Sequence, residues 1–214
     1  ITITGSNDGP IASAASNAVN EDATISGSVS ATDADLGETA TLVYTLNGAA
    51  PTGLTFNADG SYSFDASSYD SLVKDATQVL TIPYTATDAQ GVASTANLVI
   101  TITGTNDVPV ASAASNAVNE DAVVTGSVSA TDADQASGLV YSLNGAAPTG
   151  LTFNADGSYS FDAASYDSLA TGATQVITIP YTATDANNAS NSANLVITIT
   201  GSNDGPIASA ASNA

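Results

Sequence analysis

The strongest constraint on the fold is an internal repeat that takes in almost the whole sequence. Ile1-Thr-Ile-Thr-Gly5 recurs at Ile100–Gly104 and again at Ile197–Gly201, at spacings of 99 and 97 residues. The two repeats differ in length at one place, where Leu36–Thr41 corresponds to the shorter Gln135–Gly138. Loops tolerate such deletions and strands do not. A long fixed period of this kind predicts a tandem array of one domain.

The repeat also predicts the domain boundaries. We expect the end of a preceding repeat and its linker at residues 1–8, one domain at 9–105 and a second at 106–203, with a linker at 104–108. Residues 201–214 match residues 5–18 letter for letter, which predicts the start of a truncated third repeat at 204–214. Because the sequence opens in mid-pattern, we interpret it as a piece of a longer array.

Within each repeat the hydrophobic pattern has a period of two. Val92, Leu98, Ile100 and Ile102 fall on one side of an alternating run, which predicts a strand with one buried face. Further strands are expected at 24–31, 40–46, 54–57, 61–64 and 79–87, and only 67–74 looks briefly helical. Pro83 has no N–H to donate and predicts a strand edge or a bulge. About seven short strands per repeat are typical of an all-β, immunoglobulin-like antiparallel β-sandwich.

Six aromatic residues supply most of the bulky side chains of the first repeat, and all six recur 97 residues later. We interpret them as core residues, because a sandwich of this size needs large apolar side chains. They are Tyr44, Phe56, Tyr62, Phe64, Tyr69 and Tyr84.

The charge of the chain is strongly one-sided. Lys74 is the only basic residue against 21 acidic ones, giving a net charge of −20. Such a chain repels nucleic acid and anionic membranes, and no apolar run is long enough to span a bilayer. Acidic chains with few aromatics are often disordered, but here 43% of the residues are apolar and they alternate regularly.

The composition also argues against catalysis. The chain has no His and no Cys, so it lacks the ordinary Ser–His and Cys–His pairs. Two carboxylates can hydrolyse a glycoside, but the acids here lie at chain turns and recur in each repeat, which an enzyme rarely needs. We therefore expect a protein without enzymatic activity.

The acidic residues point instead to a metal ion. Without imidazole or thiolate, only oxygen ligands are available, and these favour calcium or magnesium over zinc or copper. Calcium accepts six to eight oxygens in irregular geometry from separate loops, and is therefore favoured. Asp33-Ala-Asp35 begins like an EF-hand loop, but Tyr44 occupies the twelfth position, so that motif is absent.

Several segments together resemble known repeat families. Ala31-Thr-Asp-Ala-Asp35, Tyr84-Thr-Ala-Thr-Asp88 and Thr105-Asn-Asp-Val-Pro109 resemble cadherin-type repeats. The segment Gly53–Asp65 resembles the VCBS-type repeats in the extender region of giant bacterial RTX adhesins, which are exported by type I secretion. The resemblance covers essentially the whole chain. It implies cadherin-like sandwiches on the surface of a Gram-negative bacterium.

The resemblance to cadherins implies calcium ions at the linkers between repeats. At the internal junction the implied ligands are Glu21, Asn106, Asp107, Asp132, Asp134 and Asp185. The DRE motif of cadherins is missing, and either Asp70 or Asp65 is its substitute. The half-sites at the outer ends would use Asn7, Asp8, Asp33, Asp35 and Asp88 on one side, and Glu120, Asn203 and Asp204 on the other. By contrast, Asp59 and Asp156 are expected to be turn residues.

The resemblance therefore implies a structural spacer. Calcium would neutralise the acidic junctions, stiffen the array and project a distal binding domain in adhesion and biofilm formation. The partners would be neighbouring repeats of the same chain, which we expect to be monomeric and not inserted in a membrane. Alternatives are a carbohydrate-binding or ice-binding module, or a homophilic adhesion surface.

Overall fold

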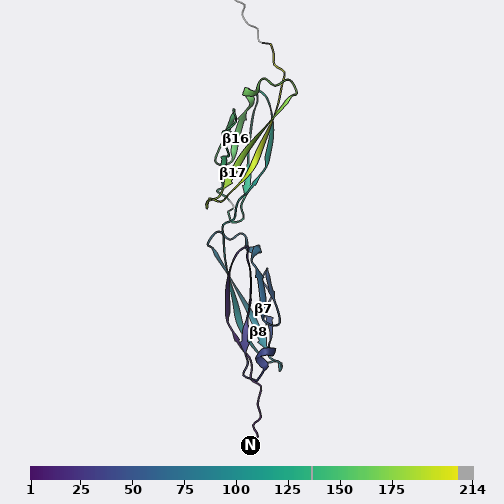
Figure 1. Cartoon of the computed structure of the whole chain (residues 1–214), viewed down its shortest axis with the longest axis vertical. Helices are drawn as coiled ribbons and strands as arrows, with labels where there is room; N and C mark the ends of the chain where they lie inside the picture. Colours follow the sequence, from purple (N-terminus) through teal and green to yellow (C-terminus); the bar gives the residue numbers. More distant parts are fainter. Residues whose placement is uncertain (136, 207–214) are drawn as a thin grey trace, which may run out of the picture. The chain divides into compact units, whose positions relative to one another are not determined.

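The computed structural model describes residues 1–135 and 137–206 of the chain. It divides into two compact units, Ile1–Asn106 and Asp107–Ala214. Each unit is one repeat, and each is built from strands with short 3₁₀ turns (Figure 1). Most of the predicted third repeat, residues 207–214, lies outside the described residues. No helix in the described ranges is long and apolar enough to cross a membrane.

The elements of the two units follow the same order. Unit 1 contains β1 (Ile11–Ser13), β2 (Ala15–Asn20), β3 (Thr24–Ser28), β4 (Ser30–Thr32), η1 (Glu38–Thr41), β5 (Val43–Leu46), β6 (Leu54–Phe56), β7 (Ser61–Asp65), η2 (Ser67–Tyr69), β8 (Thr77–Thr87) and β9 (Ala93–Thr103). Unit 2 contains β10 (Val110–Ser112), β11 (Ala114–Asn119), β12 (Val123–Ser127), β13 (Ser129–Thr131), β14 (Val140–Leu143), β15 (Leu151–Phe153), β16 (Ser158–Asp162), η3 (Ala163–Tyr166), β17 (Thr174–Thr184) and β18 (Ser190–Thr200).

Two sheets face each other in unit 1, one ordered β2-β9-β8-β5 and the other β3-β7-β6, with a small β1-β4 pair beside them. Figure 1 labels β7 and β8, one from each sheet. β1 and β2 are the two halves of one strand, interrupted at Ala14. β3 and β4 are likewise interrupted at Val29, whose N–H bonds to the Gly60 carbonyl at 2.9 Å. Counting each pair once gives seven strands, so the predicted immunoglobulin-like sandwich is confirmed.

The core lies on the face that the period of two predicted, except that Val92, which precedes β9, is 45% exposed. Leu98, Ile100 and Ile102 are fully buried on the inner face of β9. Phe64 lies in the same core on β7 of the opposite sheet, and Tyr84 lies in it on β8, the strand next to β9. The Tyr84 hydroxyl donates to the backbone carbonyls of Ser13 and Ser30, at 2.5 and 3.0 Å, and so joins β1 to β4. All six predicted aromatics are buried in this core or packed against it. The second unit has the same arrangement around Tyr181.

The structure corrects the bounds of two expected strands and of the expected helical turn. The strand expected at 40–46 begins only at Val43, because the residues before it form the 3₁₀ turn η1. The strand expected at 24–31 is interrupted and ends at Thr32, and the helical turn expected at 67–74 covers only η2.

Pro83 lies within the interior strand β8 and causes no bulge, because it pairs in continuous register with Asn97. The pairing of β5 with β8 ends at Leu46 and Tyr84. The next residue after β5, Asn47, donates its N–H to the Pro83 carbonyl. The missing N–H of Pro83 therefore faces a position that β5 no longer occupies. The local edge at this position explains why proline is tolerated there.

Candidate metal sites at the two ends of each repeat

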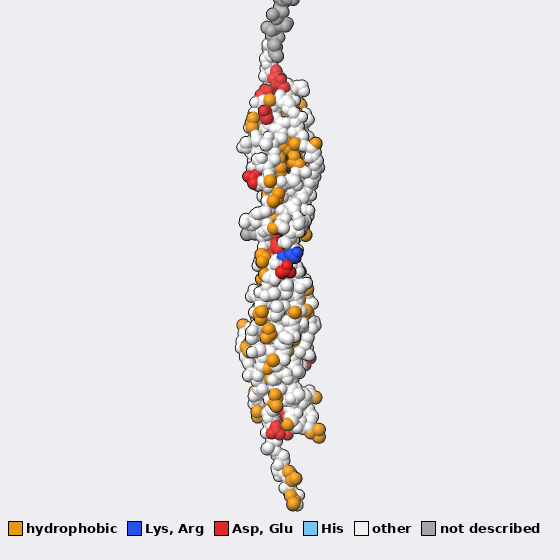
Figure 2. Space-filling view, turned by 90° about the vertical axis from the view of Figure 1, so that its left-hand side faces the viewer, with side chains coloured by type: hydrophobic (Ala, Val, Ile, Leu, Met, Phe, Trp, Pro, Cys, Tyr) orange, Lys and Arg blue, Asp and Glu red, His pale blue; other side chains and the backbone are white. Residues whose placement is uncertain are grey.

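The acidic residues of a repeat gather at its two ends. One end, the Asp-x-Asp pole, holds Asp33, Asp35 and Asp88 in repeat 1 and Asp132, Asp134 and Asp185 in repeat 2. The other end, the glutamate pole, holds Glu21, Asp22 and Asp70 in repeat 1 and Glu120, Asp121, Asp167 and Asp204 in repeat 2. Figure 2 shows acidic side chains at the end of unit 1 where residues 1–8 emerge, while the side of the unit is mostly uncharged.

At the Asp-x-Asp pole of repeat 1, two loops bring distant residues together. Asp33 follows β4, and its Oδ1 accepts the Asp35 N–H at 2.9 Å. Asp88 follows β8 and is only 6% exposed, and its Oδ1 accepts the N–H groups of Gln90 and Val92 at 3.0 and 2.7 Å. These turns hold both carboxylates in fixed positions at the end of the sandwich.

Residues 1–8 complete this pole. The Asn7 side-chain amide donates to Asp88 Oδ2 at 2.9 Å, and the Asp8 N–H donates to Asp35 Oδ2 at 2.8 Å. The bond from Asn7 and the backbone bonds lower the pKa of Asp88. Asn7, Asp33, Asp35 and Asp88 therefore lie together at this pole, and Asp8 joins them through its backbone N–H.

The same pole in repeat 2 is built on the same turns. Asp185 is 6% exposed, and its Oδ1 accepts Asn187 N–H and Ala189 N–H, both at 2.8 Å. Asp132 Oδ2 is buried and has no hydrogen-bond partner among the described residues. Burial, a hydrogen bond with Asp134 and the charge of Asp134 raise the pKa of Asp132 to about 6. A carboxylate in this position is poorly solvated by the protein.

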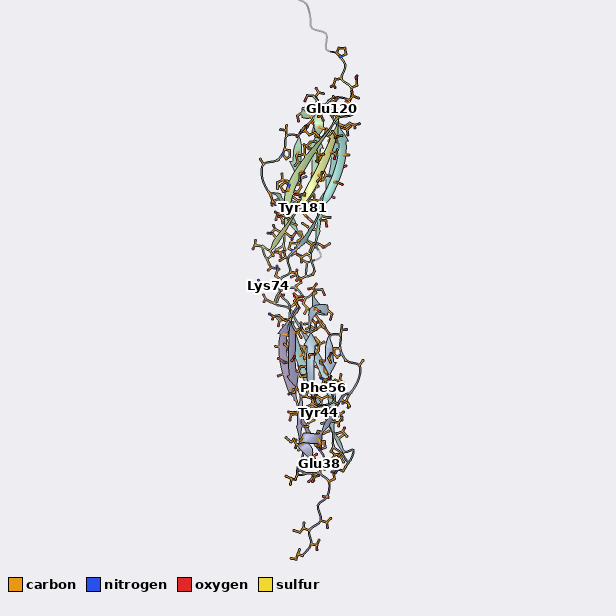
Figure 3. All side chains as sticks on the ribbon, turned by 45° about the vertical axis from the view of Figure 1, so that its right-hand side comes forward. Glu38, Tyr44, Phe56, Lys74, Glu120 and Tyr181 are labelled. Atoms are coloured by element: carbon orange, nitrogen blue, oxygen red, sulfur yellow. The ribbon has the colours of Figure 1, made fainter. Side chains whose placement is uncertain are left out.

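The glutamate pole of repeat 2 is organised by a buried carboxylate. Glu120, which is 2% exposed, accepts the N–H groups of Ser202 and Leu169 with its two oxygens, at 2.5 and 3.3 Å. The side chains of Asp121, Asp167 and Asp204 lie beside it, with one oxygen of each within 4.8 Å of the others. Figure 3 shows Glu120 at the end of unit 2 where residues 201–206 leave the sandwich.

Burial and the closeness of the acids at this pole raise the pKa values of two of them. A hydrogen bond with Asp167, burial and the Asp167 charge raise the pKa of Asp121. Burial followed by the charges of Asp167 and Glu120 raises the pKa of Asp204. The Asn203 side-chain amide donates to the Asp204 carbonyl at 3.3 Å.

The glutamate pole of repeat 1 repeats this geometry. Glu21 is 1% exposed and accepts Thr105 N–H and Leu72 N–H at 2.6 and 3.2 Å. Burial, and then a hydrogen bond with Asp70, raise the pKa of Asp22. Asp70 is thus the acid placed beside this pole. Asp65, the other acid considered in place of the DRE motif, accepts Ser67 N–H at 3.0 Å at the start of η2.

Sequence reasoning missed Asp22, Asp121 and Glu38. The first two belong to the recurring triplets Asn20-Glu21-Asp22 and Asn119-Glu120-Asp121, so their recurrence was a usable signal. Both adopt a left-handed conformation, with φ of 64°, which directs the side chain out of the β2–β3 and β11–β12 turns. Glu38 has no counterpart in repeat 2 and gave no such signal. Asp59 and Asp156 are turn residues as expected, since each accepts the N–H and hydroxyl of a serine two residues on.

The donor set fits a hard divalent cation. Every acidic or amide side chain placed at the poles offers oxygen, and within the part of the chain that the structure describes, buried oxygens of Asp33, Glu38 and Asp132 have no hydrogen-bond partner. Leaving a buried carboxylate oxygen without a partner costs free energy, and a bound calcium ion would remove that cost. Asn106 and Asp107 occupy the last position of unit 1 and the first of unit 2.

Comparisons with known proteins identify the class. Residues 7–104 match the bacterial cadherin-like domain, and residues 106–198 match a bacterial Ig domain. No match to the chain was found among curated protein sequences. The chain is thus a tandem of cadherin-like, immunoglobulin-type repeats.

Several solved structures share this fold. Mouse cadherin-23 EC22-24 is 23% identical, with a TM-score of 0.53, over 91% of this chain and 65% of that one. Human protocadherin-24 EC1-2 is 19% identical, with a TM-score of 0.52, over 94% of this chain and 100% of that one. The human desmocollin-1 ectodomain is 15% identical, with a TM-score of 0.54, over 93% of this chain and 42% of that one. At these identities the likeness concerns the fold.

The class has known general properties. Cadherin-like and immunoglobulin-like domains are typically non-enzymatic structural modules. Bacterial domains of these kinds are associated with extracellular, adhesion-related proteins, and cadherin-like domains generally bind calcium at inter-domain linkers.

The raised pKa of Asp132 predicts how the metal-free protein responds to pH. Its folded pKa of about 6 exceeds the ordinary value of 3.8, so the fold disfavours the charged form. The resulting loss of stability is absent below pH 4 and complete above pH 6. Asp132→Asn should therefore stabilise the chelated protein at pH 7 by about 1 kcal/mol, allowing for solvent screening, and leave it unchanged near pH 4.

Urea unfolding in chelator between pH 4 and 7 measures this effect. Asp156→Asn is the control, because hydrogen bonds from Ser158 lower the pKa of Asp156 and its charge favours the folded state. That variant should gain no stability at pH 7. A pH profile that is the same for Asp132→Asn and for the unmodified protein would contradict the prediction.

Proposed function

We propose that these repeats are calcium-dependent spacers in a surface adhesin of a Gram-negative bacterium, with ions at the linkers stiffening the array. One observation supports this most directly. Carboxylates converge to within 4.8 Å at the poles of a repeat, with buried oxygens that have no hydrogen-bond partner, and Lys74 is the only basic residue in the chain. A cluster of this charge needs cations, and its all-oxygen donors suit calcium.

The chain connects the glutamate pole of one repeat to the Asp-x-Asp pole of the next through a short segment around Asn106 and Asp107. We propose that ions at this junction use residues of both poles as ligands. These are Glu21, Asp22, Asp70, Asn106, Asp107, Asp132, Asp134 and Asp185. Without ions their like charges repel, and with ions the same charges hold the linker.

The proposed affinity suits an extracellular role. Extracellular calcium modules typically bind at about 10⁻⁴–10⁻³ M. Repeats of this kind would remain without calcium inside the cell and bind it after export, for which type I secretion of an RTX-type adhesin is the proposed route. The rigid array would then project a distal binding domain in adhesion and biofilm formation.

Carbohydrate stacking, the main alternative, has little support. A sugar-binding platform usually exposes an aromatic ring. In the described ranges, the exposed large hydrophobic residues are Ile, Leu and Val, and the aromatic rings of both units belong to the two cores.

Small-angle scattering tests the spacer proposal. Calcium should lengthen and narrow the distribution of molecular dimensions, and chelator should broaden it, because only bound ions hold the linker. Asp134→Ala should raise the calcium concentration needed for this change about ten-fold, since it removes a charged ligand from a loop without touching the core. Asp156→Ala removes the same charge from a turn and should behave like the unmodified protein.

Two results would contradict the proposal. A chain that stays flexible at saturating calcium cannot act as a spacer. A chain that is equally rigid in chelator holds its linker by direct packing, and calcium would then have no mechanical role.

A further inference from the structure

The Asp-x-Asp poles of the two repeats differ in one loop. In repeat 1 the loop Leu36–Thr41 forms the 3₁₀ turn η1 after Gly37, which adopts a left-handed conformation with φ of 87°. Thr39 fixes this turn against the metal-site loop, because its hydroxyl accepts the Asp33 N–H at 2.8 Å and donates to the Asp33 carbonyl at 3.2 Å. The extra residues of repeat 1 are therefore folded onto Asp33.

This turn brings a further carboxylate to the pole. One oxygen of Glu38 lies within 4.8 Å of ligand oxygens of Asp33 and Asp88. Glu38 Oε1 accepts the Gln90 side-chain amide at 2.8 Å, whereas Oε2 is buried without a hydrogen-bond partner. Figure 3 shows Glu38 at the end of unit 1, away from Tyr44 and Phe56 between the sheets.

The space beside Glu38 can hold an ion and its water. A hollow of about 250 Å³ is lined by Asn7, Asp35, Glu38 and Gln90, together with Gly5 and Ser6. A buried carboxylate oxygen with no donor, next to a hollow lined by oxygen-bearing side chains, is poorly solvated by protein alone. A cation between the oxygens of Glu38, Asp33 and Asp88, which lie within 4.8 Å of one another, would satisfy all three, and the hollow beside Glu38 leaves room for its water.

Repeat 2 has an amide where repeat 1 has this acid. Its shorter loop Gln135–Gly138 contains no Asp or Glu. The Gln135 N–H donates to Asp132 Oδ1 at 3.1 Å, and its side-chain Oε1 accepts the Ala186 N–H at 3.2 Å. Gln135 thus braces the loop against the turn after Asp185 with a neutral group.

We propose that Glu38 is a calcium ligand found in repeat 1 and not in repeat 2, and that it raises the calcium affinity of the Asp-x-Asp pole that contains it. The inference rests on the calcium-binding function proposed above. Calcium affinity in oxygen sites rises with the number of charged ligands. In an array, the loop after the Asp-x-Asp motif would then set the calcium concentration at which each junction becomes rigid.

Nuclear magnetic resonance of the whole chain separates the two poles. The Gly91 N–H bonds to the Asp88 carbonyl, and the Asn188 N–H bonds to the Asp185 carbonyl, both at 3.3 Å, so each amide reports on its own pole. In a calcium titration, Glu38→Gln should raise the midpoint observed at Gly91 about ten-fold and leave the midpoint at Asn188 unchanged. Gln135→Glu should lower the midpoint at Asn188 and leave Gly91 unchanged.

Two controls separate ligation from other effects of the charge. Asp59→Asn removes one charge from a turn of repeat 1 and should leave both midpoints unchanged. Without calcium, Glu38→Gln should melt no lower than the unmodified chain, because it relieves repulsion with Asp33 and Asp88. A lower melting temperature in chelator, with an unchanged calcium midpoint at Gly91, would show a purely structural role and overturn the inference.

The outcome also distinguishes this inference from the proposed function. If calcium moves neither amide in the unmodified chain, the calcium-binding function itself is wrong. If calcium moves both amides and Glu38→Gln leaves the midpoint at Gly91 unchanged, only the role of Glu38 is wrong.

Discussion

Calcium at about a hundred times its dissociation constant should stabilise a repeat by about 2.7 kcal/mol for each ion that binds only the folded state. For a domain of about 100 residues this corresponds to a rise of about 10–20 °C in melting temperature. The physical reason lies in the poorly solvated, like-charged acids at the poles: burial and then a neighbouring acid raise the pKa values of Asp22 and Asp132, and a hydrogen bond with Asp167 and burial raise that of Asp121. A divalent ion replaces the repulsion between these acids with attraction.

Thermal melting followed by circular dichroism measures the effect, in millimolar calcium and in chelator. Sodium chloride at matched ionic strength is the control, because it screens the charges without occupying a site. Magnesium should stabilise less, since it prefers a strict octahedron and loses its water reluctantly. Equal melting temperatures in calcium and in chelator would show that calcium does not bind preferentially to the folded repeats, and would contradict the prediction.

Gly53→Ala should destabilise repeat 1 by on the order of 3–5 kcal/mol, a loss seen only at special positions. Gly53 has φ of 84°, in the left-handed region that disfavours side chains, and an added Cβ would lie 2.0 Å from the Asp65 carbonyl oxygen. The backbone has no room to adjust, because the Asp65 N–H donates to the Gly53 carbonyl at 3.0 Å. Gly150 is in the same position against Asp162 in repeat 2.

Gly91→Ala is the matched control for this substitution. Gly91 has nearly the same φ, 86°, but an added Cβ would meet nothing within 4 Å. It should therefore lose only the conformational cost, about 1–2 kcal/mol. Urea unfolding at saturating calcium compares the two variants. Equal losses would show that the contact with Asp65 is relieved by movement of the β6–β7 hairpin.

The sequence alone determined the fold class because burial in a sandwich follows a local pattern. Every second residue of a strand faces the same way, so Leu98, Ile100 and Ile102 could be assigned to the core without knowing their partners. The aromatic residues followed for the same reason. The breaks at Ala14 and Val29 depend on which sheet each half-strand joins, and that pairing is not local.

The polar residues at the poles depended on the tertiary structure to different degrees. The family pattern indicated Glu21, Asp33 and Asp88, because turns of fixed length place them at the strand ends. The partnership of Asp22 with Asp70 joins residues 48 positions apart, and only the packing of η2 beside the β2–β3 turn brings them together. Glu38 reaches Asp33 and Asp88 because a 3₁₀ turn closes over them. Its loop differs in length between the two repeats, so Glu38 does not recur and the repeat pattern could not indicate it.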